Sequence, residues 1–282
     1  MIQCIQVEQT RYDTRMYCNL VYSNAPTGSV AAIPLHFHLI CPRGNQDERF
    51  PLLIYIGGGG WRVSSPERHL PELAYFASRG FAVASIEYRT TANVRFPAQI
   101  EDVKTAVRYL KKNSGQFQID PEAVFLMGGS AGAYLAAMAA LTGETGQFRG
   151  QENSDISGKV RGAVCLYGVY DLTRYAHALQ TQDPAALPVQ LFLPGTDQGI
   201  PEAASPVSYI KGEAVPFLLL HGTADHMVSF EQSVLFHDTL KAHGNEPLLY
   251  LLKDADHADS AFSQPSVQKL ILDFLKTNLE MK

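Results

Sequence analysis

The stretch that decides the fold is Phe125-Leu126-Met127-Gly128-Gly129-Ser130-Ala131-Gly132, in which a short apolar run ends in the pattern G-x-S-x-G. The almost wholly apolar segment 131–141 follows, and it predicts a helix covered on most sides. A strand, a sharp turn and a helix in this order are typical of a nucleophile elbow, which holds a serine in a strained conformation. Glycine is expected at 128 and 132, because a Cβ atom there would collide with the neighbouring strand and helix. The first amides of the helix, at the positive end of its dipole, favour developing negative charge at the reacting atom.

Apolar runs and helical patterns alternate from about residue 50 onward, which predicts an α/β fold with a mostly parallel central sheet and helices on both faces. The alternating segment 33–40 predicts an antiparallel strand that leads into this sheet. The segment 171–214 has no clear periodicity and several prolines, so we expect short helices there that cover the site as a small lid-like insertion. The predicted buried strands are 51–56, 81–87, 123–127, 160–167, 216–221 and 247–253, and the clearest helical patterns are 100–110, 131–141 and 267–275.

Composition excludes several classes of protein. The chain has 282 residues, 46% hydrophobic and 18% charged, which is ordinary for a globular protein and predicts one catalytic domain over 1–282. A net charge of -5 without a basic cluster argues against nucleic-acid binding, and no apolar run approaches the ~18 residues of a membrane span. No signal peptide and no framework of cysteines is visible, so the expectation is a cytoplasmic, reduced protein. No cofactor motif is present, and no carboxylate or cysteine accompanies His36 and His38, so no metal site is predicted.

The acid that serves the serine is predicted to be Asp225. A serine hydroxyl is a poor nucleophile at neutral pH and needs a histidine, held by a carboxylate, to take its proton. In this kind of fold the chain order is serine, acid, histidine, each on a loop after a strand. Asp225 lies just past the apolar run 217–220, and although a loop aspartate is often only a helix cap, its position favours the catalytic interpretation. Asp171, also just past a strand, is the next candidate, and Asp197 in the irregular segment ranks below it.

The base is predicted to be His257. It follows the predicted strand 247–253 and precedes the last helix, and of nine histidines it alone occupies that loop. A lone loop histidine is normally just solvated. The catalytic interpretation of His257 therefore depends on its position relative to Ser130 and Asp225. His221 and His226 are the alternatives, but they lie beside the acid in sequence rather than opposite it.

The glycine run 57–60 directly follows a predicted strand and ends at Trp61. Acyl transfer builds negative charge on the carbonyl oxygen, and each preorganised amide there contributes roughly 3–4 kcal/mol at the transition state. A glycine run lets the backbone approach this oxygen. A phosphate-binding loop is the alternative, but the lysine of the Walker pattern is absent. The expected oxyanion donors are the amides of Gly59, Gly60 and Ala131.

Five segments, taken together, carry a resemblance to a known family: residues 57–61, Glu87-Tyr88-Arg89, 96–103, 128–132, and His221-Gly222 with Asp225. With them the chain resembles the α/β-hydrolase esterases near the hormone-sensitive-lipase group. It looks most like the bacterial feruloyl- and acetyl-esterase branch, which is carbohydrate esterase-like and borders on the prolyl oligopeptidase-like domains. The resemblance covers nearly all of residues 50–257. It implies an α/β-hydrolase fold and a serine esterase that needs no cofactor.

The resemblance also implies that Tyr88-Arg89 and the segment 96–102 brace the site beneath the elbow. From the residues alone, Asp102 has two interpretations: it braces the site, or it is a solvated helix residue. The chain departs from the family pattern at Gly57, where the family usually has histidine. A glycine at this position predicts a more mobile oxyanion loop.

The leading hypothesis is a serine carboxylesterase that forms an acyl-enzyme and accepts short acyl groups such as acetyl, on sugars or xylan fragments by family analogy. The expected partner is a small-molecule ester, and a homo-oligomer is left open. A small peptidase or amidase with the same triad is the alternative, followed by a non-catalytic ligand-binding hydrolase fold. The expected pocket walls are aromatic, although aromatic residues are as often ordinary packing: Trp61, Tyr167, Tyr170, Tyr175 and Phe192.

Overall fold

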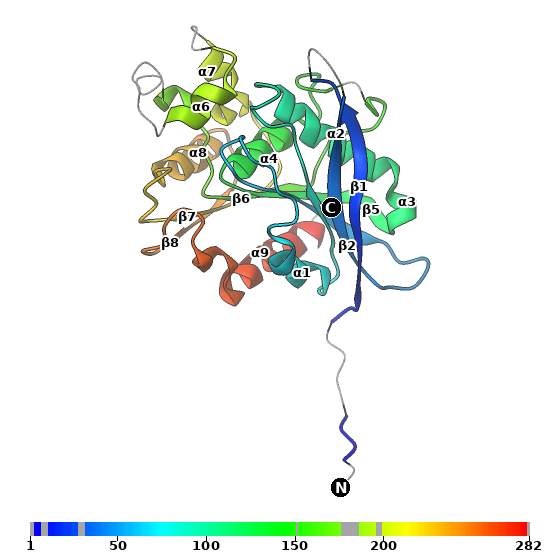
Figure 1. Cartoon of the computed structure of the whole chain (residues 1–282). Helices are drawn as coiled ribbons and strands as arrows, with labels where there is room; N and C mark the ends of the chain where they lie inside the picture. The colour runs from blue at the N-terminus through cyan, green and yellow to red at the C-terminus, as the bar shows by residue number, and fades with distance from the viewer. Residues whose placement is uncertain are drawn as a thin grey trace.

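The computed structural model describes residues 3–6, 11–27, 32–150, 152–175, 186–195 and 199–280. Within these ranges eight strands form one sheet in the order β1-β2-β4-β3-β5-β6-β7-β8, and helices cover both of its faces (Figure 1). The strands are β1 Thr14–Ala25, β2 Ile33–Pro42, β3 Phe50–Ile56, β4 Ala82–Ile86, β5 Ile119–Gly129, β6 Gly162–Leu166, β7 Phe217–Gly222 and β8 Leu248–Leu252.

The pairing of the strands confirms the predicted mixture of directions. β1 pairs antiparallel with β2, and β2 pairs antiparallel with β4. From β4 onward every neighbouring pair is parallel, from β4 with β3 through to β7 with β8. The carboxyl ends of β3, β5, β6, β7 and β8 therefore meet at one edge of the sheet, which is where a parallel sheet carries its site.

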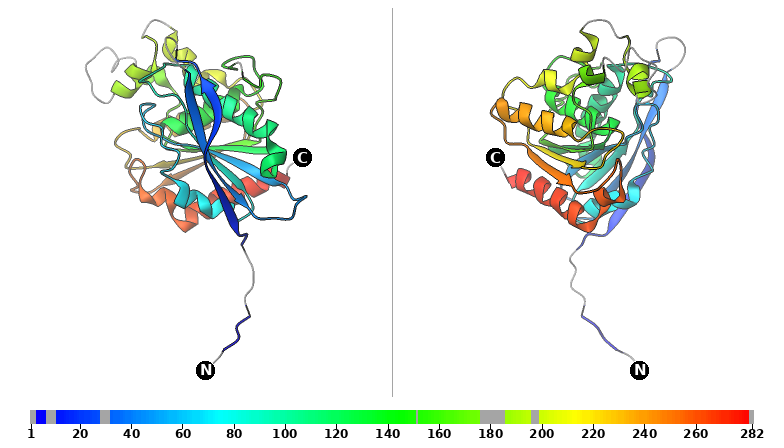
Figure 2. Two further views of the ribbon diagram at one scale, coloured as in Figure 1. Left: turned by 45° about the vertical axis from the view of Figure 1, so that its right-hand side comes forward. Right: turned by 90° about the vertical axis from the view of Figure 1, so that its left-hand side faces the viewer.

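The helices form a layer on each face of the sheet (Figure 2). One apolar core includes residues of α2, α4 and α8, and the other includes residues of α1 and α9. Among the helices of the described ranges, none combines the length and the apolar character needed to cross a bilayer. The bounds are α1 Leu70–Ala77, α2 Ala98–Lys112, the short α3 Ser114–Phe117, α4 Ala131–Thr142, α8 Glu231–Ala242 and α9 Pro265–Glu280.

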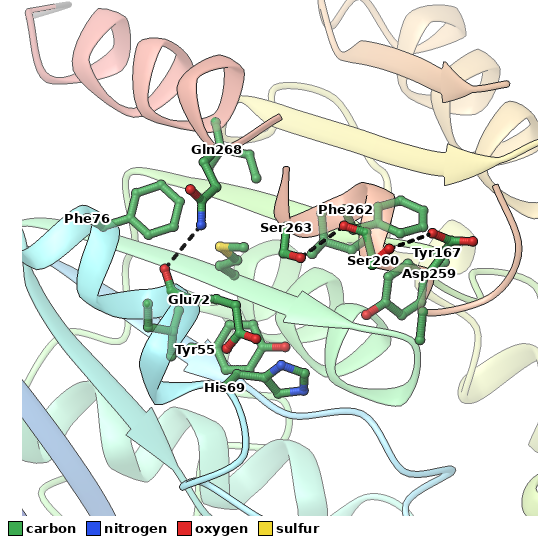
Figure 3. Close-up of a pocket in the computed structure, with 15 residues that line it drawn as sticks. Tyr55, His69, Glu72, Phe76, Tyr167, Asp259, Ser260, Phe262, Ser263 and Gln268 are labelled. Atoms are coloured by element: carbon green, nitrogen blue, oxygen red, sulfur yellow. Dashed lines mark hydrogen bonds between the residues drawn. The ribbon is translucent and has the colours of Figure 1, made fainter. Parts of the chain in front are cut away.

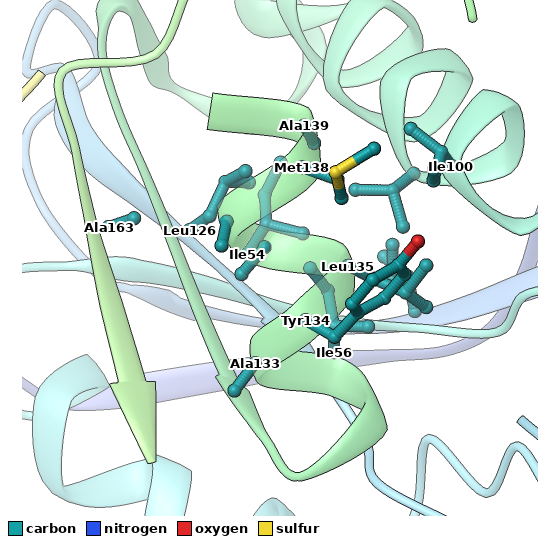
Figure 4. Packing of buried hydrophobic residues seen from close by; sticks show 14 of the residues in the cluster. Ile54, Ile56, Ile100, Leu126, Ala133, Tyr134, Leu135, Met138, Ala139 and Ala163 are labelled. Atoms are coloured by element: carbon teal, nitrogen blue, oxygen red, sulfur yellow. The ribbon is translucent and has the colours of Figure 1, made fainter. Parts of the chain in front are cut away.

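Helix α4 is buried almost all round, as its composition predicts. Ala133, Leu135 and Met138 on it are completely buried, and the sheet residues Ile54 and Leu126 beside it are buried as well (Figure 4). The helix also contacts α2, which packs beside it on the same face of the sheet. This packing fixes the start of α4, which is the residue after the serine of the elbow.

The irregular segment holds short helices, as expected: η1 Leu172–Tyr175, α6 Leu187–Phe192, α7 Ile200–Ala203 and η3 Pro206–Tyr209. Helices α6 and α7 lie at the top of Figure 1, away from α1 and α9. Prolines occupy the first turns of α6, α7 and η3, where a missing amide hydrogen costs nothing.

Two strands differ from the expectation. β1 was not expected, because its exposed and buried positions follow no clean alternation. The segment 247–253 was expected to be a buried strand, and this is wrong for β8. Leu248, Tyr250 and Leu251 are 45%, 43% and 43% exposed, because β8 is the last strand of the sheet. An apolar run alone does not distinguish an edge strand from a central one.

Candidate active site

Ser130 lies on the turn between β5 and α4, with φ 53° and ψ -119°. Its amide donates to the carbonyl of Leu166 on the neighbouring strand at 2.9 Å. The expectation for the two glycines is confirmed. A Cβ atom at Gly128 would collide with the carbonyl of Gly132, and one at Gly132 would collide with the carbonyl of Ile56. The turn is therefore a strained elbow that only small neighbours permit.

The structure brings Ser130, Asp225 and His257 into one line of hydrogen bonds. Nε2 of His257 lies 2.9 Å from Oγ of Ser130, and Nδ1 lies 2.7 Å from Oδ2 of Asp225. Each residue follows a different strand, β5, β7 or β8, so the three meet because these strands are parallel and end at the same edge of the sheet. The side chain of Asp225 is fully buried and that of His257 is 7% exposed. With the carboxylate facing Nδ1, that nitrogen carries the proton, and Nε2 can accept the proton of Ser130.

The carboxyl of Asp225 is surrounded by donors. The amides of Met227 and Val228 donate to Oδ1 at 2.9 and 2.8 Å. Burial alone would raise the pKa of this carboxyl, and it is the largest single influence. The hydrogen bonds from His221, His257 and Val228 together outweigh it and hold the pKa of Asp225 well below its usual range. The acid is therefore ionised wherever His257 can act as a base.

His221 stands behind the acid rather than beside the serine. Its Nε2 faces two acceptors, Oδ2 of Asp225 at 3.1 Å and the carbonyl of Val228 at 3.0 Å, so this nitrogen carries the proton. Its Nδ1 lies 2.7 Å from Oγ of Ser233, and the side chain is completely buried. The sequence offered His221 only as an alternative base. The structure instead makes it a second imidazole that fixes the position of Asp225.

The remaining candidates lie elsewhere. His226 is exposed and bonds to Asp256, and Asp171 bonds to Thr173 within its own turn. Asp197 lies outside the described residues.

His36 lies 2.9 Å from the carboxylate of Glu87, so the expectation that no carboxylate accompanies it is wrong. The partner comes from β4's carboxyl end, which the sequence order did not reveal. Within the described ranges no group of three or more His, Cys, Asp or Glu side chains is placed to hold a metal ion.

The glycine loop after β3 lies against the elbow. Gly59 and Gly60 have φ of 135° and 58°, values that disfavour any residue with a side chain. At Gly58 a Cβ atom would come within 2.8 Å of the carbonyl of Gly129. Gly60 and Ala131 line one cavity together with Ser130, whereas Gly59 is not among the residues that line it.

The buried side chain of Tyr88 holds this loop, and the buried side chain of Asp102 holds Arg89, the residue that follows Tyr88. The hydroxyl of Tyr88 faces the carbonyls of Gly57 and Val63 at 3.1 and 3.2 Å. Asp102 is 3% exposed and pairs with the guanidinium of Arg89 at 2.7 Å, so its interpretation as a solvated helix residue is wrong. The main-chain amide of Arg89 also donates to Asp102, which ties the segment after β4 to α2.

The cavity at Ser130 is small, about 80 Å³. Trp61 forms part of its wall and stacks on Phe192 of α6 with ring centroids 4.3 Å apart. Beyond Gly60, Ser130, Ala131 and His257, its walls are apolar: Trp61, Val169, Pro188, Val189, Met227 and Val228.

The other predicted aromatic walls have different places. Tyr170 as a pocket wall is wrong, because it is fully buried and stacks on Phe236 at 4.3 Å in the core. Tyr167 does not line the cavity at Ser130, although its ring contacts that of His257 with centroids 4.8 Å apart. The side chain of Tyr175 lies outside the described part of the chain.

Residues 38–240, well over half of the chain, match the model of the BD-FAE family. The chain belongs to the BD-FAE family. The match includes Ser130 and Asp225 but ends before His257, whose place at the serine is given by the fold.

Relatives and solved structures agree with this family. Esterase LipQ of Mycobacterium tuberculosis is 35% identical over 80% of this chain and 55% of its own length. The probable carboxylic ester hydrolase LipM of the same organism is 32% identical over 71% of this chain and 47% of its own length. The chain thus spans about half the length of the curated relatives it matches.

Esterase 2 of Thermogutta terrifontis, in its apo structure, has a TM-score of 0.76, 25% identity and 96% coverage of both chains. Further structures of that enzyme hold butyrate and propionate. The family and these neighbours confirm the predicted α/β-hydrolase fold and the resemblance to esterases of the hormone-sensitive-lipase-like group.

Proposed function

We propose that this chain hydrolyses esters of short-chain carboxylic acids through a covalent acyl-enzyme. The observation that carries the proposal is the hydrogen-bonded line from Asp225 through His257 to Ser130, which ends in a small apolar cavity. The esterase names of relatives and structural neighbours support an ester rather than an amide substrate.

In the acylation step Oγ of Ser130 attacks the carbonyl carbon of the ester while Nε2 of His257 takes the hydroxyl proton. The imidazolium that forms is stabilised by the buried carboxylate of Asp225. The carbonyl oxygen gains negative charge and is held by main-chain amides, for which Gly60 and Ala131 at the cavity wall are the best placed and Gly59 is next to them. His257 then gives its proton to the alcohol oxygen as the carbon–oxygen bond breaks.

Deacylation repeats these steps with water. His257 takes a proton from a water molecule, whose oxygen attacks the acyl carbon, and the proton returns to Oγ of Ser130 as the acid leaves. The strained backbone at Ser130 keeps Oγ exposed to the cavity throughout.

The length of the acyl group follows from the cavity. A volume of about 80 Å³ is well below the roughly 300–1,000 Å³ of most ligand pockets, which favours a short acyl chain. Acetyl, propionyl and butyryl chains fit this space, and the propionate and butyrate held by the Thermogutta enzyme support that range. Longer chains would need α6 to move.

Initial rates on p-nitrophenyl acetate, butyrate, octanoate and laurate test the proposal, with the Ser130→Ala variant beside the wild type. We expect rates that fall steeply beyond butyrate and vanish in the variant. Wild-type turnover retained by Ser130→Ala would reject the serine mechanism, and equal rates on all four esters would reject the short-acyl assignment.

A further inference from the structure

Ser233, in the first turn of α8, contributes a completely buried hydroxyl to the hydrogen bonds around the catalytic acid. Its Oγ lies 2.7 Å from Nδ1 of His221, and Nε2 of the same ring lies 3.1 Å from Oδ2 of Asp225. The line of hydrogen bonds from Ser130 through His257 to Asp225 therefore continues through His221 to Ser233. It connects the loops that carry the triad to a helix that the triad itself does not use.

Ser233, His221 and Asp225 have the composition of the catalytic triad, but they do not form a second one. The side chains of Ser233 and His221 are completely buried, and Ser233 does not line the cavity at Ser130. A nucleophile must reach the carbonyl carbon of its substrate, and a sealed hydroxyl does not. The role of this hydroxyl therefore lies in its effect on His221.

The hydrogen bonds along this line fix the position of each proton. Nε2 of His221 faces two acceptors, Oδ2 of Asp225 and the carbonyl of Val228 at 3.0 Å, so it carries the proton of the ring. Nδ1 of the neutral ring is then an acceptor, and Ser233 donates its hydroxyl proton to it. His257 donates to the same Oδ2 from its own Nδ1 at 2.7 Å. Two imidazoles of opposite tautomer thus share one carboxylate oxygen.

These bonds hold the carboxylate of Asp225 from all sides. Oδ1 accepts from the amides of Met227 and Val228, and Oδ2 accepts from the two imidazoles. A carboxylate offers about four acceptor positions, so this one does not turn without breaking a bond. A fixed acid matters because it orients the histidine that takes the proton of the serine.

The same imidazole also holds a wall of the cavity. Val228 donates its amide to Asp225 and accepts from His221 at its carbonyl. Val228 also lines the cavity at Ser130. His221 therefore fixes the acid and this wall as one unit, and a displaced His221 would disturb both.

Ser233 is itself held in place by its neighbour in α8. The side-chain oxygen of Gln232 accepts from the amides of Tyr170 and Asp171, both at 2.9 Å, and its nitrogen donates to the carbonyl of Asp171 at 3.2 Å. The ring of Tyr170 stacks on Phe236, one turn further along the helix, with centroids 4.3 Å apart. The start of α8 is thereby tied to the loop after β6, which gives Ser233 a rigid support.

The catalytic histidine is held in a different way. The ring of Tyr167, which lines a separate cavity of about 260 Å³ (Figure 3), contacts the ring of His257 at 4.8 Å and that of Phe262 at 4.6 Å. Ring contacts thus hold His257, whereas hydrogen bonds hold Asp225. The position of the acid therefore depends on the orientation of His221.

We propose that Ser233 is a positioning residue for the catalytic acid, and that its hydroxyl holds His221 in the tautomer and orientation that direct Nε2–H at Asp225. The proposal rests on the proposed esterase function and adds to it a buried residue outside the triad. Without the hydroxyl, Nδ1 of His221 is a buried acceptor that has lost its donor. The ring then gains freedom to turn, and Asp225 loses a donor whenever it does.

Three variants separate positioning from packing. Ser233→Ala removes the hydroxyl, and Ser233→Thr keeps it. Thr239→Val is the matched control, because it removes another hydroxyl of α8, one that donates to the carbonyl of Leu235 in the same helix. For each variant, kcat and KM on p-nitrophenyl acetate are measured together with thermal unfolding. NMR of protein labelled with 15N-histidine reads the tautomer of each ring, and His221→Phe assigns the signals of His221.

We expect Ser233→Ala to lower kcat and kcat/KM equally, by about 3- to 10-fold. Ser233→Thr and Thr239→Val should keep both values. In the wild type, His221 should carry its proton on Nε2 and His257 on Nδ1. The Nδ1 signal of His221 should move in Ser233→Ala toward that of a nitrogen without a hydrogen bond and should stay in place in Thr239→Val.

An unchanged kcat in a folded Ser233→Ala would overturn the positioning role, and so would an equal loss in Thr239→Val or in a folded Ser233→Thr. A proton on Nδ1 of His221 in the wild type would overturn the assigned tautomer. If the wild type cleaves no ester, the proposed function fails, and the histidine spectra still decide whether Ser233 fixes the tautomer of His221.

Discussion

The substitution Val189→Ala should lengthen the acyl chain that the enzyme prefers. Val189 lies on α6, is 4% exposed and forms part of the wall of the cavity of about 80 Å³ at Ser130. The change removes two methyl groups, which opens room for two more carbons of an acyl chain. Each methylene that becomes buried contributes about 0.8 kcal/mol. Two of them contribute about 1.6 kcal/mol, which corresponds to a change of about 15-fold in relative kcat/KM.

The assay compares kcat/KM for p-nitrophenyl hexanoate with that for p-nitrophenyl acetate, so that the shared chemistry cancels. Val103→Ala is the matched control, because Val103 on α2 is completely buried but does not line this cavity. Both variants should lose roughly 1–3 kcal/mol of unfolding free energy through the lost contacts. Denaturant unfolding confirms that both remain folded in the assay.

We expect the hexanoate-to-acetate ratio to rise about 15-fold in Val189→Ala and to stay constant in Val103→Ala. An unchanged ratio in a folded Val189→Ala would refute the placement of the acyl chain. A rise in both variants would attribute the effect to loosened packing instead of to the cavity wall.

Three further perturbations test the surroundings of the site. In His221→Phe the buried Asp225 loses a charge-assisted donor worth about 1.5–3 kcal/mol, so kcat/KM on p-nitrophenyl acetate should fall about 10- to 100-fold, and an unaffected rate would remove His221 from the site. Hydrogen bonds hold the folded pKa of Asp225 below the ~3.9 of an unfolded aspartate, so its stabilisation is complete above about pH 4 and is lost as the pH falls further. Asp225→Asn should therefore lose unfolding free energy less steeply than the wild type on acidification, and parallel curves would contradict this. Asp102→Ala breaks the buried ion pair with Arg89 and leaves Glu101, at 3.7 Å, as the remaining carboxylate at that guanidinium. It should cost about 3–5 kcal/mol in denaturant unfolding, whereas a loss below about 1 kcal/mol would mean that the pair is solvated.

The layered fold was predictable because burial leaves a clear trace in the sequence. Strands β3 to β7 are nearly continuous apolar runs, and α4 is apolar on all sides, so both were visible without coordinates. Strand β1 was missed, since it is half exposed and lacks regular alternation. The exposure of β8 was misjudged because β8 lies at the edge of the sheet. The residues of β8 do not reveal the order of the strands in space, which decides this position.

The residues of the triad could be predicted from the sequence, but the residues around them could not. Ser130 and Asp225 could be found because an elbow and a strand end mark their positions. His221 looked like a spare base, because only the coordinates show which of its neighbours accept hydrogen bonds. Tyr170 was misplaced because an aromatic residue just past a strand can turn into the core as easily as into a cavity.

The claim that Ser130 is the nucleophile is tested most directly by covalent labelling. The protein is treated with diethyl p-nitrophenyl phosphate, residual activity on p-nitrophenyl acetate is followed, and the labelled peptide is identified by mass spectrometry. We predict one diethylphosphoryl group per chain, on Ser130, at a level that tracks the loss of activity. No label should appear in Ser130→Ala. Full loss of activity with the label on another residue, or continued turnover by a chain labelled on Ser130, would contradict the account.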